Sequence, residues 1–283
     1  MSEEADLDHL VPDTEVRTEK ESAVAEPDPV PSSGAGAARR RRSPAVRISH
    51  QPGFVLHSYA FSESSLVVEV FSRDYGRVAL MAKGAKRPTS RLRGVLQTFQ
   101  PLNFCWTGKS ELRTLVSAEW VGGMAPLENS ALLYGFYINE LILKLTVRED
   151  PHPKLFDHYV ATLVRLASAE PASAVLRLYE LAILKETGVA ADLSVCTRSG
   201  RSVDPELVYV VDPEKGPRPA KAEDQAPKVS GKTLVDMVKE DYSDPVTQLQ
   251  SKLLMRGLLA HHLNGAQIQT RRILADLLEL QDF

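Results

Sequence analysis

Cysteine is scarce in this sequence: Cys105 and Cys196 are the only two among 283 residues. Two cysteines do not make a disulfide framework in a chain of this length, which indicates a reducing compartment. Long hydrophobic runs are also missing, because no apolar stretch reaches the roughly 18 residues that a membrane helix needs. Residues 2–6 are mostly acidic, not basic and then apolar, so they do not resemble a secretory signal. These absences predict a soluble cytoplasmic protein.

The motifs of common enzyme classes are absent as well. There is no His-Glu-x-x-His helix, no Gly-x-Ser-x-Gly turn and no paired-glycine dinucleotide fingerprint after a strand. Ser-Gly-Lys-Thr at 230–233 resembles the end of a phosphate-binding loop, but the required earlier glycine is Ala226, so we interpret Ser230 as a helix cap. Cys196 starts a Cys-x-x-Ser that lacks the second thiolate of a zinc site. The sequence predicts a protein that is not an enzyme, with no catalytic residues, metal or cofactor.

Negative charge is concentrated at the N-terminus, where residues 1–38 hold ten Asp and Glu but two Lys and Arg. Because the whole chain carries −3 and this segment contributes −8, the remainder carries +5. Residues 1–46 are polar and Pro-rich, with a run of four arginines at 39–42, and hold too little apolar surface to offset their ordering entropy. We predict a disordered tail over 1–46. Its arginine run either contacts nucleic acid or neutralises the acidic residues.

Strand patterns dominate the next part of the chain, which predicts a β-barrel over 47–125. The third strand returns from the second through a turn and forms a hairpin with it. The longest gap separates the third and fourth strands, as in an OB-type barrel, although the number of strands does not exclude an SH3-like barrel. The five predicted strands cover residues 53–58, 66–71, 77–83, 102–106 and 112–116.

From residue 126 the hydrophobic period changes to 3.6, which predicts a helical domain over 126–283. The predicted fold class is therefore α+β, an N-terminal five-stranded OB-fold barrel followed by an α-helical bundle. An irregular insertion is expected at about 195–229, because the segment is rich in Pro, Lys and Glu. The expected helices are one that starts at Asn129 or Ser130 and stops at 149–153, one around 155–166, one from Pro171 to Gly188, and others at 232–239, 245–263 and 271–280.

The most informative stretch is residues 83–93, in the gap between the third and fourth strands. A flexible cationic loop between strands suits a polyanion, although the same composition also suits a loop that is merely solvated. Tyr75, in the neighbouring hairpin turn, either stacks on a base or packs against the barrel. The basic path consists of Lys83, Lys86, Arg87, Arg91 and Arg93, with Arg73 and Arg77 beside the hairpin turn as its extension.

Several stretches resemble the RecO family of recombination mediators, and they occur in the order expected of that family. The resemblance covers about residues 50–280 and leaves the N-terminal tail out. The stretches are 53–59, 63–66, 70–78, 82–94 and 96–102 in the predicted barrel, and 133–141, 148–156, 177–181, 262–265 and 270–272 in the helical domain.

The resemblance implies an OB-fold barrel that binds single- and double-stranded DNA and anneals complementary strands in DNA repair and homologous recombination. It also implies work with RecR on strands coated by single-strand-binding protein, so that RecA is loaded. Some members hold a four-cysteine zinc site; this sequence matches that site only at Cys196, so no zinc is expected. The seven cations of the basic path would then bind DNA with a salt-dependent affinity.

The resemblance further implies that the acidic, apolar C-terminal tail of single-strand-binding protein docks on the helical domain. Such a tail needs an apolar pocket edged by cations, although an apolar stripe of this kind is often plain core. The first helix offers a candidate docking set in Tyr137, Leu141, Lys144, Leu145 and Arg148.

Two other functions stay open, a general OB-fold nucleic-acid binder and an adaptor whose basic loop binds an acidic protein. The expected location is the cytoplasm, at the bacterial nucleoid.

Overall fold

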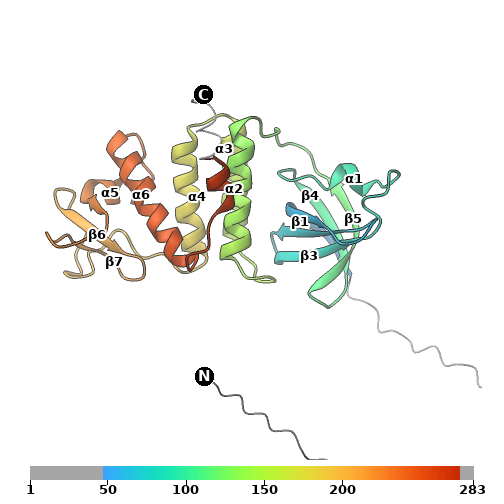
Figure 1. Ribbon diagram of the computed structural model, residues 1–283, viewed down its shortest axis with the longest axis horizontal. Coiled ribbons are helices and arrows are strands. Elements are labelled where there is room, and N and C mark those ends of the chain that lie inside the picture. Colours follow the sequence, from blue (N-terminus) through green and yellow to red (C-terminus); the bar gives the residue numbers. More distant parts are fainter. Residues whose placement is uncertain (1–46, 275–283) are drawn as a thin grey trace, which may run out of the picture. The chain divides into compact units, whose positions relative to one another are not determined.

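The computed structural model describes residues 47–274, and its first part is a barrel of five strands (Figure 1). All five predicted strands are present, and the first begins six residues earlier than predicted. The prediction of disorder over 1–46 falls outside the described residues. The strands are β1 (Arg47–Ala60), β2 (Leu66–Ser72), β3 (Gly76–Ala82), β4 (Leu102–Thr107) and β5 (Leu112–Trp120).

The barrel is closed, with the strand order β1-β2-β3-β5-β4. β1 pairs antiparallel with both β2 and β4, and β3 pairs parallel with β5. This order is that of an OB fold, so the structure excludes the SH3-like alternative. A short helix, α1 (Leu92–Val95), lies in the connection between β3 and β4, where the sequence predicted only a loop.

The alternation of β2 explains how the barrel meets the helices. Val68 and Val70 point into the barrel interior, where they belong to a core cluster with Phe104 and Trp106. The opposite face of β2 is also buried, because helices cover it. Phe71 lies on that face, and its ring centroid is 5.8 Å from that of Tyr159. Residues of the barrel's outer face therefore belong to the core of the helical part.

The helical part follows the predicted order, and α2, α3 and α4 pack side by side (Figure 1). A further helical segment begins at Gln269 and continues to residue 274; most of the helix predicted at 271–280 falls outside the described residues. Among residues 47–274, no helix combines the length and apolar character that crossing a membrane requires. The named helices are α2 (Ser130–Leu145), α3 (Pro153–Ala167), α4 (Ala172–Glu186), α5 (Gly231–Val238) and α6 (Pro245–His262).

Residues 195–229 were predicted to be irregular, but they contain three short strands between their loops. β6 (Val208–Asp212), β7 (Gly216–Pro219) and β8 (Lys228–Ser230) form an antiparallel sheet in the order β7-β6-β8. The sequence hides this sheet because its strands are only three to five residues long. β7 also contains two prolines, which an edge strand tolerates because one side of its backbone needs no ladder hydrogen bonds.

Candidate nucleic-acid interface

The basic stretch 83–93 forms a series of tight turns. Backbone N–H groups donate from Arg87 to Gly84 O at 3.1 Å, from Ser90 to Arg87 O at 3.0 Å and from Arg93 to Ser90 O at 3.3 Å. Ala85, in the first of these turns, is buried in the barrel core. The stretch is therefore anchored and internally hydrogen-bonded, although its composition suggested a flexible loop. We call residues 83–93 the basic loop.

All five cations of the basic loop have exposed side chains, namely Lys83, Lys86, Arg87, Arg91 and Arg93. Within residues 47–274 none of them forms an ion pair with a carboxylate. Exposed like charges on one short loop repel one another and attract a counter-ion or a phosphate backbone. The structure thus places these five predicted residues together on one surface; their contact with DNA stays a prediction.

A second loop, residues 61–65 between β1 and β2, lies directly against the basic loop. The N–H of Lys86 donates to Ser64 O at 2.9 Å, and the Lys86 ammonium donates to Ser62 O at 3.1 Å. The N–H of Gly84 donates to Ser65 Oγ at 3.3 Å. These bonds fix the two loops to each other, so residues 61–65 belong to the same surface as the cations. The sequence alone did not predict that residues 61–65 belong to this surface.

The other two predicted DNA contacts, Arg73 and Arg77, lie at the opposite end of β3. Because β3 has seven residues, its two ends are about 20 Å apart. Arg73 pairs with Asp157 of α3 at 3.2 Å, and the Arg77 guanidinium donates to Leu143 O of α2. Both arginines therefore contact the helical part and do not extend the surface of the basic loop.

Tyr75, in the same hairpin turn, has a packing role. Its ring meets the ring of Trp106 edge-on, with centroids 5.4 Å apart, and Trp106 is fully buried in the barrel. Of the two interpretations of Tyr75, packing against the barrel is the one that the contacts support.

The α2 stripe proposed for tail docking is partly internal, with Leu145 half-buried and only Lys144 and Arg148 exposed. Tyr137 is 2% exposed and Leu141 is fully buried. The guanidinium of Arg271 lies over the Tyr137 ring, 5.2 Å from its centroid, and the Lys144 ammonium donates to Gln267 O at 3.0 Å. Docking of a partner on this stripe would therefore require the segment 267–271 to leave it. Burial and the nearby Glu180 raise the pKa of Tyr137, so its hydroxyl remains a donor.

Arg148, the last member of that stripe, pairs with Glu69 of β2. Glu69 is 4% exposed and also accepts a hydrogen bond from the Tyr59 hydroxyl at 3.1 Å. Burial and the Glu69 carboxylate raise the pKa of Tyr59, which keeps the hydroxyl protonated as a donor. The backbone supports the same contact, since Glu149 N–H donates to Arg77 O at 2.9 Å. Arg148 thus joins the helical part to the barrel.

Glu140 holds the segment after α6 against α2, and its substitution gives a pH-dependent test. Its carboxylate accepts the N–H of Gln269 at 2.8 Å, and the N–H and hydroxyl of Thr270 at 2.9 and 2.7 Å. Burial alone would raise the pKa of Glu140, but these hydrogen bonds and Lys144 outweigh it and lower the pKa. Its stabilisation is therefore present above the unfolded pKa of about 4.3 and is lost as the pH falls through the depressed folded value.

We expect Glu140→Gln to lower the free energy of unfolding by about 1 kcal/mol at pH 7, because the carboxylate caps a helix start. The difference from the parent protein should shrink as urea titrations are repeated from pH 5 down to pH 3. The amide of the variant does not titrate in this range, so a difference that stays constant would contradict the role of the Glu140 charge.

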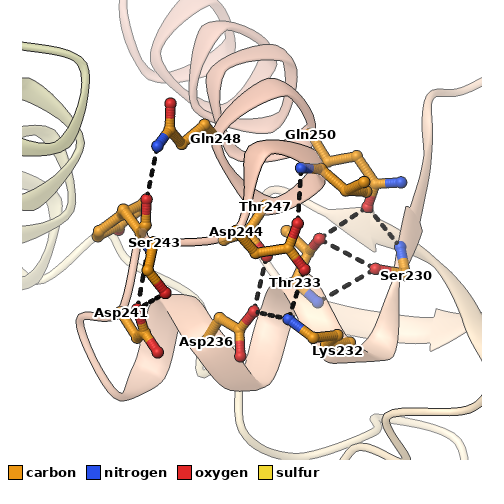
Figure 2. A network of polar contacts seen from close by, with 12 residues as sticks. Ser230, Lys232, Thr233, Asp236, Asp241, Ser243, Asp244, Thr247, Gln248 and Gln250 are labelled. Carbon is orange, nitrogen blue, oxygen red and sulfur yellow. Dashed lines mark hydrogen bonds and ion pairs between the residues drawn. The ribbon is translucent and has the colours of Figure 1, made fainter.

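The Ser-Gly-Lys-Thr motif at 230–233 is part of a structural network between α5 and α6 (Figure 2). Ser230 caps α5 by accepting the N–H of Thr233 at 3.1 Å. The Lys232 ammonium pairs with Asp236 and Asp244, each at 2.6 Å, and Figure 2 shows it between these two carboxylates. The lysine and the hydroxyls are thus used within the protein, which agrees with the interpretation of Ser230 as a helix cap.

Cys196 lies in a tight turn before β6. It is 2% exposed, and its N–H donates to Arg201 O at 2.8 Å while its carbonyl accepts the N–H of Gly200 at 2.9 Å. A hydrogen bond from Ser199, the residue in place of a second cysteine, lowers the pKa of the thiol. In the part of the chain that the structure describes, no three His, Cys, Asp or Glu side chains are grouped to hold a metal.

Comparison with known proteins agrees with this architecture. Residues 46–124 match the family described as Recombination protein O N terminal, and residues 128–237 match Recombination protein O C terminal. The chain is 53% identical to the DNA repair protein RecO of Burkholderia pseudomallei, over 92% of this chain and 99% of that protein. It is 52% identical to the DNA repair protein RecO of Ralstonia nicotianae, over 95% of this chain and 97% of that protein.

A third relative, the DNA repair protein RecO of Paraburkholderia xenovorans, is 56% identical over 86% of this chain and 82% of its own length. These matches run through both the barrel and the helical part, and they include the basic loop. The chain therefore belongs to the RecO family of DNA repair and recombination proteins.

Proposed function

We propose that the chain binds single- and double-stranded DNA at the basic loop and anneals complementary strands. The observation that carries this proposal is the set of five exposed cations on hydrogen-bonded turns at one edge of an OB barrel. Annealing makes and breaks no covalent bond. It requires that the repulsion between two phosphate backbones be neutralised while the bases stay free to pair, and lysine and arginine provide this without base preference.

The proposal extends to the mediator role that membership of the RecO family suggests. In that role the chain acts with RecR on strands coated by single-strand-binding protein and helps to load RecA. The experiment that tests the whole proposal is annealing of complementary oligonucleotides that are first coated, with and without RecR. A mediator anneals the coated strands and needs RecR to load RecA on them. A general nucleic-acid binder would anneal only naked strands, and an adaptor would anneal neither.

For the tail of single-strand-binding protein, we propose a groove between the end of α6 and the segment that follows it. Leu263 and Ile268 give the groove buried apolar side chains. Three arginines line it as well, Arg256, Arg271 and Arg272. An apolar floor with cations beside it matches a tail that carries apolar side chains, acidic side chains and a terminal carboxylate.

We expect Arg256→Glu to weaken binding of a fluorescently labelled tail peptide by about tenfold in an anisotropy titration, because charge-assisted hydrogen bonds contribute roughly 1.5–3 kcal/mol. Lys252→Glu, an exposed cation one turn away on α6 and outside the groove, is the matched control and should leave binding within about twofold. Equal losses in the two variants would place the tail elsewhere.

A further inference from the structure

The end of β1 presents aromatic rings at alternate positions. Residues 53–56 of β1 are buried and residues 57–60 are exposed, so the strand leaves the core at this point. His57 and Tyr59 are two residues apart, and alternate side chains of a strand point to the same side. Their ring centroids are 5.7 Å apart. Phe61 occupies the next alternate position, immediately after the strand.

Phe61 is held beside the basic loop. It is 61% exposed, although it is a large apolar side chain with no polar group to solvate. Its N–H donates to Ser65 O at 3.1 Å, which closes the loop 61–65. The same loop accepts the hydrogen bonds from Gly84 and Lys86 described above, so the loop that begins with Phe61 is fixed to the basic loop.

This combination of groups has a specific chemistry. Cations neutralise phosphates regardless of strandedness, but an aromatic face beside them gains free energy only from a base that is free to stack. Bases are free in single strands and are stacked inside a duplex. Tyr59 is 41% exposed and its hydroxyl is fixed by Glu69, which limits the ring to one orientation. A preordered ring loses little entropy when a base stacks on it.

We propose that His57, Tyr59 and Phe61 form a stacking row for the bases of single-stranded nucleic acid, whose phosphates the basic loop binds. The row adds affinity for single strands, because the stacked bases of a duplex cannot use it. This inference rests on the DNA binding proposed for the basic loop. The aromatic residues stack on bases, which the cations of the basic loop cannot do.

The test compares three oligonucleotide ligands of equal length, a single strand, a duplex and an abasic single strand, which keeps the phosphates and lacks the bases. We expect Phe61→Ala to weaken binding of the single strand by about tenfold, since stacking contributes roughly 1–3 kcal/mol per base. Binding of the duplex and of the abasic strand should change less than twofold, and the salt slope should be unchanged. Phe61→Trp, which keeps an aromatic ring at this position, should bind the single strand as the parent does.

Trp120→Ala is the matched control. Trp120 is 65% exposed at the far end of the barrel, where it pairs with Leu102, whose other partner is Gly53 of β1. This variant should bind all three ligands as the parent does. In a Trp120→Phe background, the Trp introduced at position 61 should also lose fluorescence when oligo(dT) is added, because the remaining Trp106 is fully buried.

Equal weakening of all three ligands by Phe61→Ala would overturn the stacking role and assign the ring to support of the basic loop. Unchanged DNA binding together with weaker RecR binding would also overturn it, and would assign the ring to a protein interface. Failure of the DNA-binding proposal is recognised separately. In that case the parent protein itself binds none of the three ligands, or reversal of the loop charges leaves all three affinities unchanged.

Discussion

Reversing the charge of four cations of the basic loop should weaken single-stranded DNA binding by roughly 1,000-fold at about 50 mM salt. Each phosphate contact contributes about 0.7 to the slope of log affinity against log salt for single strands, so loss of four contacts should reduce the slope by about three. The loss does not depend on the base sequence of the DNA, and the affinity for duplex DNA should fall by a similar factor. The measurement is a fluorescence titration repeated at several salt concentrations. The variant carries Glu at Lys86, Arg87, Arg91 and Arg93.

The control for this variant must carry the same change of net charge away from the barrel. Four exposed lysines of the helical part serve this purpose, because no carboxylate among the described residues pairs with them. The control should keep a salt slope close to that of the parent and lose affinity only through its net charge. If it matches the loop variant in both slope and affinity, the loop is not the binding surface. These lysines are Lys154, Lys185, Lys215 and Lys239.

The barrel strands could be predicted from sequence because their signals are local. Period-two alternation fixes a strand from a few adjacent residues, and β2 shows it in Leu66, Val68 and Val70. The closed barrel was predicted from the number and length of the strands, but no local pattern predicts its parallel pairing of β3 with β5, which joins residues more than 30 apart in sequence. The sheet at β6–β8 was missed because its strands are too short to show a period.

In the candidate site, too, only the features that depend on nearby residues could be predicted from sequence. The five cations of the basic loop are adjacent in sequence, so their proximity in space follows from the chain itself. Arg77 and Arg148 are basic residues too, but each has a partner far away in the sequence. Arg77 contacts Leu143 of α2, 66 residues away, and Arg148 contacts Glu69 of β2, 79 residues away. No local pattern distinguishes a cation that pairs across the protein from one that faces solvent. Phe61 is the converse case, because the alternation of rings at 57, 59 and 61 is visible in the sequence and only the structure places it beside the basic loop.

The second prediction with a large effect concerns the close approach between the hairpin turn of the barrel and the connection after α2. Gly76 ends the hairpin turn with φ of 62°, a conformation that costs any L side chain free energy. A Cβ at this position would lie 2.0 Å from Asp150 O, so the backbone of one segment would have to move. That movement would disturb the hydrogen bond from Glu149 N–H to Arg77 O, and the Arg148–Glu69 ion pair close to it.

We expect Gly76→Ala to lower the free energy of unfolding by about 3–5 kcal/mol, because it combines a left-handed backbone with a clash against backbone atoms. For a protein of this size that corresponds to a fall of roughly 10 °C in Tm. Gly188→Ala separates the two causes, since Gly188 has φ of 74° and a Cβ there would meet nothing within 4 Å. It should cost only about 1 kcal/mol. The free energy of unfolding of both variants is measured by urea unfolding. Similar losses in the two would mean that the clash with residue 150 adds no cost to that of the left-handed backbone.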